Sequence, residues 1–133
     1  LSLHDALPIY TIEKLLGRGG MGAVYKGVQT NLDRTVAIKI LPPGVEKEDP
    51  SFAERFKNEA RLMAKLMHSA VVGVFDFGST SAGQLYIVME YVDGTDVSQM
   101  IRSQKKLPPE HALAITAHVC DALAAAHASV PVR

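Results

Sequence analysis

Residues 16–27 read Leu-Gly-Arg-Gly-Gly-Met-Gly-Ala-Val-Tyr-Lys-Gly, and this stretch carries most of the information about the fold. It contains the spacing G-x-G-x-x-G at Gly17, Gly19 and Gly22. Glycines spaced in this way let backbone N–H groups approach phosphate oxygens without a side chain between them. The residues after Gly22 alternate as they do in a strand, so the pattern predicts a β-hairpin that lies over phosphates.

The same glycine spacing occurs in dinucleotide-binding folds, where a helix follows the glycines. The strand expected after Gly22 argues against that class. The stretch also lacks the G-K-[ST] ending of a Walker-type loop, which is therefore excluded. For this motif alone, a plain glycine hairpin that binds nothing remains the structural alternative.

The composition is that of a globular domain. The chain has 133 residues, enough for one ordinary domain, with 47% apolar and 21% charged residues. Lys plus Arg balances Asp plus Glu at 14 each, which argues against a dedicated nucleic-acid binder. The single cysteine fits a reducing, cytoplasmic location, and the five histidines suggest no metal cluster. No apolar run approaches the roughly 20 residues of a membrane helix, so we expect no membrane segment in this chain.

The periodicity of apolar residues predicts strands over 10–16, 23–28, 35–41, 71–77 and 85–90. A helix is expected from Ser51, with Glu54 completing a capping box. Two further helices are expected over 97–104 and from Pro108 to about His127, the last apolar nearly all round, as is typical of a buried helix. Three strands, a helix, two strands and more helices indicate an α+β fold with an antiparallel sheet. Residues 1–9 are interpreted as a leader or foreign sequence.

Two charged residues stand out against apolar patterns. The strand residues 36–39 place Ala37 and Lys39 on one face, where a small residue leaves room for a flat ring and the lysine brings a charge beside it. Glu59 falls in a helix stripe with Phe52, Phe56, Met63 and Leu66. Because a carboxylate on an apolar face is costly unless it is paired, Lys39 is its natural partner. The alternatives are a solvated edge lysine and an exposed helix glutamate.

In order and spacing these motifs make the chain resemble the small lobe of a eukaryotic-type protein kinase, from Tyr10 to about His127. The family pattern is G-x-G-x-x-G-x-V, then V-A-I-K, then a helix glutamate. The sequence of residues 16–27 resembles the corresponding stretch of bacterial serine/threonine kinases in particular. The resemblance implies a five-stranded antiparallel sheet plus one helix, with the small lobe and hinge over 10–92. The first helices of the large lobe would follow over 93–133.

The resemblance also implies which residues bind ATP. Met89 would be the gatekeeper, and the Glu90 carbonyl and Val92 backbone would bind the adenine edge. Lys39, oriented by Glu59, would hold the α- and β-phosphates, and these two are the expected catalytic residues. Asp96 is either a ribose-binding acid or the N-cap of the helix that starts at Val97, and both roles stay open. The whole expected nucleotide-binding set is Leu16, Gly17, Gly19, Gly20, Met21, Gly22, Val24, Ala37, Lys39, Met89, Glu90, Val92 and Asp96.

Asp76-Phe77-Gly78 matches the family's magnesium-binding tripeptide, but it precedes the hinge, whereas the family motif follows the catalytic loop. We therefore expect no metal ligand there. The catalytic His-Arg-Asp occurs nowhere in these 133 residues, so the Mg²⁺ ligands and the base are expected in a large lobe outside them.

The expectation is an ATP-binding portion of a serine/threonine protein kinase. Its full-length parent would transfer phosphate from ATP, with Mg²⁺, to a protein substrate. The fragment itself is expected to be inactive and cytoplasmic, with any membrane anchor of the parent outside it. The alternative is a nucleotide-binding pseudokinase or a regulatory binding module.

Overall fold

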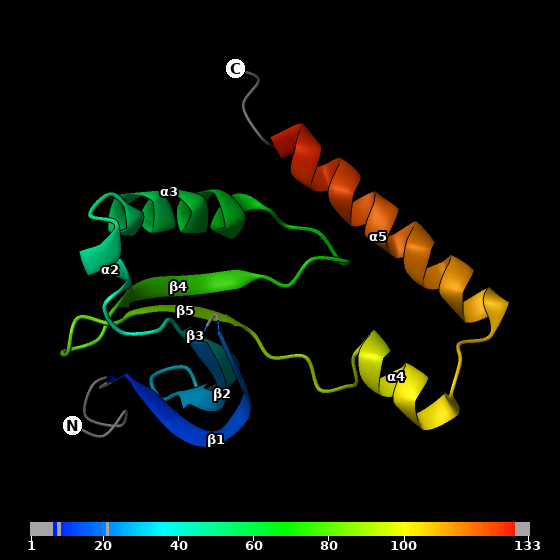
Figure 1. Ribbon diagram of the computed structural model, residues 1–133, viewed down its shortest axis with the longest axis horizontal. Coiled ribbons are helices and arrows are strands. Elements are labelled where there is room, and N and C mark those ends of the chain that lie inside the picture. The colour runs from blue at the N-terminus through cyan, green and yellow to red at the C-terminus, as the bar shows by residue number, and fades with distance from the viewer. Residues whose placement is uncertain (1–6, 8, 21, 130–133) are drawn as a thin grey trace. The chain divides into compact units, whose positions relative to one another are not determined.

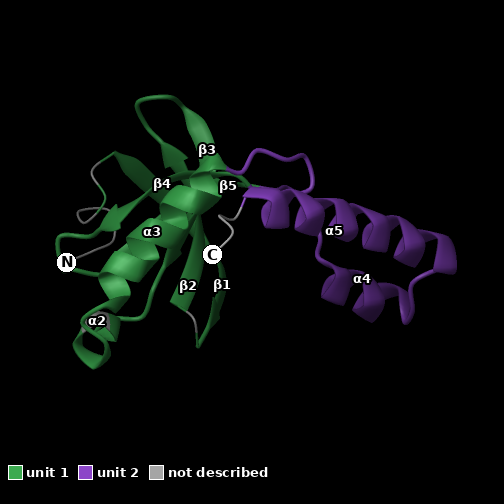
Figure 2. Cartoon of the chain, turned by 90° about the horizontal axis from the view of Figure 1, so that it is seen from above, with its two compact units in different colours: residues 1–65, 73–91 green, residues 66–72, 92–133 purple. Residues whose placement is uncertain are grey.

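The structure is a computed structural model that describes residues 7, 9–20 and 22–129. The elements follow in the order β1 (Tyr10–Gly19), β2 (Gly22–Gln29), β3 (Arg34–Ile40), α2 (Val45–Glu48), α3 (Phe52–Lys65), β4 (Val74–Ser79), β5 (Leu85–Glu90), α4 (Val97–Gln104) and α5 (Pro109–Ser129) (Figure 1). The chain forms two compact units, residues 1–65 with 73–91 and residues 66–72 with 92–133 (Figure 2).

The first unit contains a five-stranded sheet with the strand order β1-β2-β3-β5-β4, in which every neighbouring pair is antiparallel. The predicted α+β architecture is therefore confirmed. A strand, not a helix, follows Gly22, because β1 and β2 pair from Tyr10–Gln29 down to Gly19–Gly22. This hairpin rules out the dinucleotide-binding alternative, which needs a helix at that point.

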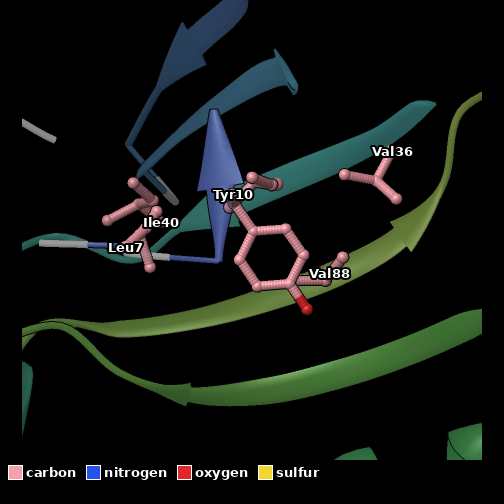
Figure 3. Packing of buried hydrophobic residues seen from close by; sticks show 6 residues of the cluster. Leu7, Tyr10, Val36, Ile40 and Val88 are labelled. Atoms are coloured by element: carbon pink, nitrogen blue, oxygen red, sulfur yellow. The ribbon is translucent and has the colours of Figure 1, made fainter. Parts of the chain in front are cut away.

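One face of the sheet is buried beneath the start of the chain. Its core consists of aliphatic residues and one tyrosine from four segments: Leu7, Tyr10, Val36, Ile38, Ile40 and Val88 (Figure 3). Leu7 is only 1% exposed, and its carbonyl accepts a hydrogen bond from the Tyr10 N–H at 3.0 Å. Leu7 thus packs in the core of the sheet, which its sequence context does not indicate, because a single apolar residue before a strand produces no periodic signal. Residues 1–6 and 8 lie outside the described residues.

The opposite face of the sheet is covered by α3. A second core joins Phe56 of this helix to Leu41 and Leu85, with Phe77 and Ile87 packed against it. The Phe56 and Phe77 rings meet edge to face, with their centroids 6.4 Å apart. This aromatic contact fixes α3 over β4 and β5.

The start of α3 differs from the predicted capping box. The Ser51 hydroxyl and N–H both donate to Oδ1 of Asp49, at 2.7 and 3.0 Å, and Arg55 also pairs with Asp49. The bond from the Ser51 N–H uses the donor that the Glu54 side chain would need in a capping box, and Glu54 instead lies 3.8 Å from the Lys57 ammonium. The short helix α2 was not predicted, because four residues are too few to show a helical period.

The second unit contains α4 and α5. The predicted bounds of α4 are confirmed, whereas α5 begins at Pro109 and extends two residues beyond the expected His127. No residue of α5 is buried, so the apolar side chains of this helix are exposed or half-buried in the second unit. Within the described residues, α5 is also long and apolar enough to cross a membrane by length and composition alone, contrary to the sequence-based expectation. Its many alanines and few charges produce this match, and the core helix of a soluble protein meets the same criteria.

Candidate nucleotide-binding site

The glycine hairpin is shaped by one residue that needs to be glycine and by several that leave open space. Gly22 has φ +107°, and a Cβ atom there would come within 3.0 Å of the Ile40 carbonyl oxygen. Gly17, Gly19 and Gly20 differ, because a Cβ atom on any of them would meet nothing within 4 Å. Gly22 therefore serves the fold, while the other three leave the backbone accessible to a ligand. Met21, also predicted to contact nucleotide, lies outside the described residues.

Four predicted site residues come together on one face of the sheet. Val24 pairs with Lys39, and Lys39 pairs with Ile87 on the next strand. One step along, Ala37 lies between Lys26 and Met89. Directly paired residues of an antiparallel sheet point to the same side, so Val24, Ala37, Lys39 and Met89 share a face. Leu16 lies at the edge, in a register irregularity of β1 between Leu15 and Gly17, and is 43% exposed.

Because Ile87 packs against the α3 core, α3 lies on the same side of the sheet as Lys39. The predicted ion pair between Lys39 and Glu59 is nevertheless absent from the described residues, and Glu59 is exposed to solvent. The helix buries Phe56 and Ala60 instead, and Met63 of the predicted stripe is 48% exposed. Because Phe56 belongs to both stripes, the buried face is displaced toward Ala60 by less than the roughly 100° between neighbouring helix residues.

The end of β5 is held by two hydrogen bonds to Gly73, the residue before β4. The Glu90 N–H donates to the Gly73 carbonyl at 2.8 Å, and the Gly73 N–H donates to the Glu90 carboxylate at 3.2 Å. Both bonds position the segment that the resemblance identifies as the start of the hinge. Val92 follows in the second unit and is 63% exposed.

Asp96 is the N-cap of α4. Its Oδ1 accepts from the Gln99 N–H at 2.7 Å, and the Gln99 side chain accepts from the Asp96 N–H at 3.0 Å. These reciprocal bonds form a capping box. The cap role, one of the two open alternatives, is therefore present in the structure.

Asp76, in the tripeptide that mimics a magnesium motif, has a structural partner. Its Oδ2 accepts a hydrogen bond from the Tyr10 hydroxyl at 2.9 Å. Burial of the phenol, together with the neighbouring Asp76, raises the pKa of Tyr10 well above its usual range. Burial also raises the pKa of Tyr86 nearby. Among the described residues, no three His, Cys, Asp or Glu side chains gather where they could hold a metal ion.

An open pocket of about 470 Å³ lies on the other side of the hairpin. Tyr25 and Ile40 line it, and both belong to the core face that is opposite to Lys39. Val24, Ala37, Lys39 and Met89 do not line this pocket. The pocket is therefore distinct from the face of these four residues, although Gly19 and Gly22 of the hairpin also line it.

Lys26 was not among the predicted site residues, yet it shares the face of Ala37 and Met89. The alternation of Val24 and Lys26 along β2 was the available signal. That alternation alone does not indicate a site, because a lysine on a strand is commonly a solvated residue.

The comparisons with known proteins agree with this arrangement. The model of the protein kinase domain family matches residues 10–132. The chain is 41% identical over 119 residues to the serine/threonine-protein kinase PknH of Mycobacterium bovis, covering 90% of this chain and 20% of that protein. It is 42% identical over 121 residues to the probable serine/threonine-protein kinase SCO3848 of Streptomyces coelicolor, covering 89% and 18%.

Solved structures give the same result. The PknI kinase domain of Mycobacterium tuberculosis superposes with a TM-score of 0.79 at 36% identity, covering 90% of this chain and 47% of that one. The chain thus spans about a fifth of its curated relatives and about half of the solved kinase domains. With the family model matching most of its length, the chain belongs to the protein kinase family, as part of a kinase domain similar to those of bacterial serine/threonine-protein kinases.

Proposed function

We propose that this chain is the ATP-binding part of a serine/threonine protein kinase, which positions the nucleotide but does not transfer phosphate by itself. The observation that carries the proposal is the shared face on which Val24, Ala37, Lys39 and Met89 lie beside the glycine hairpin. An apolar surface that carries the Lys39 ammonium group next to open backbone suits a flat base joined to phosphates.

Phosphoryl transfer depends mainly on positioning and on stabilisation of charge. In the proposed complex, hairpin amides hold the β- and γ-phosphates and Lys39 holds the α- and β-phosphates. Val24 and Ala37 cover the adenine ring, and Met89 lies beside it. The Glu90 carbonyl and the Val92 backbone bind its edge. Asp96 uses Oδ1 for its helix cap, and the ribose contact stays a prediction from the resemblance.

The exposed Glu59 implies a second conformation of α3. Catalysis by protein kinases needs the pair between the strand lysine and the helix glutamate. For the pair to form, Glu59 would have to turn toward the side of α3 where Phe56 and Ala60 are now buried. The described residues contain no ion pair between Lys39 and Glu59.

The catalytic base, the Mg²⁺ ligands and the protein-substrate platform belong to parts of a kinase that these 133 residues do not match, since His-Arg-Asp is absent from them. The purified chain should consequently show no phosphate transfer to a generic protein substrate. In the parent protein, the proposed reaction is transfer from ATP to a serine or threonine hydroxyl.

A regulatory pseudokinase is the second candidate, and the unpaired Lys39 and Glu59 are the observation in its favour. The two candidates differ in the behaviour of the full-length parent. A kinase phosphorylates a generic protein substrate and loses this activity with Lys39→Met. A pseudokinase binds nucleotide and leaves the substrate unmodified.

The proposal is tested by titrating the chain with a fluorescent ATP analogue and displacing it with ATP. Saturable binding is expected, and Lys39→Met should weaken it at least tenfold because a desolvated charge-assisted contact is lost, ~1.5–3 kcal/mol. Lys106→Met is the matched control, because Lys106 is exposed in the loop between α4 and α5. Absence of saturable binding, or equal binding by wild type and Lys39→Met, would refute the proposal.

A further inference from the structure

Lys26 lies between a carboxylate and an aromatic ring that come from two other segments. Its ammonium nitrogen is 5.0 Å from the centroid of the Tyr91 ring and 3.7 Å from Oε2 of Glu13. Glu13 belongs to β1, Lys26 to β2, and Tyr91 directly follows the last residue of β5. We call these three residues the Lys26 bridge. It joins the glycine hairpin to the chain that leaves β5.

A backbone irregularity explains how Glu13 takes part. The pairing of β1 with β2 shifts between Ile12 and Lys14, which leaves Glu13 without a partner residue on β2. An unpaired residue of this kind is a β-bulge, and bulges turn a side chain away from its regular direction. The bulge brings the Glu13 carboxylate to the ammonium of Lys26, although Lys14 is the direct cross-strand partner of Lys26.

The Lys26 bridge spans the row of residues that forms the proposed adenine cover. Lys26 pairs with Ala37, and Ala37 pairs with Met89, two residues before Tyr91. One end of the Lys26 bridge lies on β2, the strand that follows the glycine turn, and the other end lies in the segment proposed to bind the adenine edge. A change in the separation of these ends would open or close the space for a flat ring.

We infer that the Lys26 bridge is a positioning device that holds the glycine hairpin and residues 89–91 at the spacing a purine nucleotide requires. Lys26, Glu13 and Tyr91 are positioning residues, because they act on the site through the two segments that they join. This inference rests on the proposed nucleotide binding and extends it. If both segments are held in place before binding, less conformational entropy is lost when the nucleotide binds, and the affinity is therefore higher.

The geometry also indicates which contact matters more. The Lys26 and Glu13 side chains are 28% and 44% exposed, and ion pairs with this exposure contribute little. A cation over an aromatic face contributes enough at an exposed site to change a binding constant about two- to fivefold. The ring face, not the Tyr91 hydroxyl, is therefore the decisive part. Tyr91→Phe should preserve the bridge and Tyr91→Leu should break it.

The test measures the Kd of a fluorescent ATP analogue for variants of the full chain. Lys26→Met and Tyr91→Leu should each raise the Kd about two- to fivefold, and the double variant should be no weaker than the weaker single variant. Lys26→Arg and Tyr91→Phe should bind as the wild type does, and Lys106→Met is the surface control. Equal Kd values for Tyr91→Leu and Tyr91→Phe, or additive effects in the double variant, would overturn the inference.

Amide hydrogen exchange provides a reading that does not depend on nucleotide. Without nucleotide, Tyr91→Leu should speed exchange in residues 22–29 and 89–91, with α2 and α3 unchanged, while Tyr91→Phe should leave all of these rates unchanged. Exchange rates that are the same in Tyr91→Leu and wild type would contradict the bridge even if nucleotide binds. If the wild type binds no nucleotide, the proposed function fails, and the exchange rates alone decide whether the bridge holds the two segments.

Discussion

Replacing Gly22 by alanine should disrupt the hairpin, whereas the same change at Gly20 should not. The backbone of Gly22 has φ +107°, a region that costs an L-residue about 1–3 kcal/mol. The added methyl group would also meet the Ile40 carbonyl oxygen inside 3.0 Å, and the Ile40 carbonyl carbon and Leu41 Cα at 3.1 Å. Backbone atoms cannot rotate away as a side chain can, so the overlap adds about 1–3 kcal/mol. The expected total loss of unfolding free energy is about 2–4 kcal/mol, because the hairpin can relieve part of the overlap by moving away from β3.

Tyrosine signals make this measurement specific to the first unit. The chain has no Trp and four Tyr, at positions 10, 25, 86 and 91, all of which lie in that unit. Urea unfolding followed by near-UV circular dichroism should show a lower midpoint for Gly22→Ala. Gly20→Ala should stay within about 0.5 kcal/mol of wild type, because its added Cβ atom meets nothing within 4 Å. Equal midpoints for the two variants would refute the assignment of Gly22 to the close approach between hairpin and β3.

Three further predictions concern the packing around the site. Leu7→Ala should lower the unfolding free energy by about 2–5 kcal/mol, because Leu7 is 1% exposed in the core. The control Leu32→Ala, at a residue that is 60% exposed, should change the unfolding free energy by less than about 0.5 kcal/mol, and similar losses in both variants would contradict the burial of Leu7. The pKa of Tyr10 is raised in the folded state, so the contribution of its neutral phenol to stability is complete below the unfolded pKa of about 10 and is lost as pH rises above that value. In urea unfolding, Tyr10→Phe should therefore make the fall in stability between about pH 10 and 12 shallower than in the wild type. An unchanged dependence of stability on pH would count against a buried, neutral Tyr10. Asp96→Ala should reduce the far-UV helix signal and cost about 0.5–2 kcal/mol, because the α4 cap is lost, whereas Asp96→Asn should retain the helix. An equal loss of helix signal in the two variants would argue against the cap.

The sequence allowed good predictions where local signals coincide with the final structure. The bounds of β5 and α4 match their predicted ranges, because a polar turn or a capping residue marks each start. The glycine hairpin was also predictable, since alternation resumes directly after Gly22. The strands β1 and β2 are longer than predicted because the glycine residues themselves take part in pairing, down to Gly19 with Gly22.

Tertiary packing decided the features that were not predicted. The face of α3 depends on how the Phe56 and Phe77 rings fit together, and the stripe that included Glu59 was one of two that the spacing allows. The burial of Leu7 and the hydrogen bond from Tyr10 to Asp76 join residues that are far apart in sequence. The Lys26 bridge needs a bulge at Glu13, and an apolar pattern does not report a one-residue shift in register.

The face that carries Val24, Ala37, Lys39 and Met89 is the central claim, and an NMR titration with ATP tests it most directly. Amide and methyl shifts should move together along β1, β2 and residues 87–91, with the largest changes at Gly17 to Val24 and at Ala37, Lys39 and Met89. The side-chain methyl groups of the opposite face should stay unchanged, including those of Leu7, Ile38 and Val88 in the first core. Saturable shifts concentrated on that core face or in the pocket beside Tyr25, with none around Lys39, would contradict the proposed site.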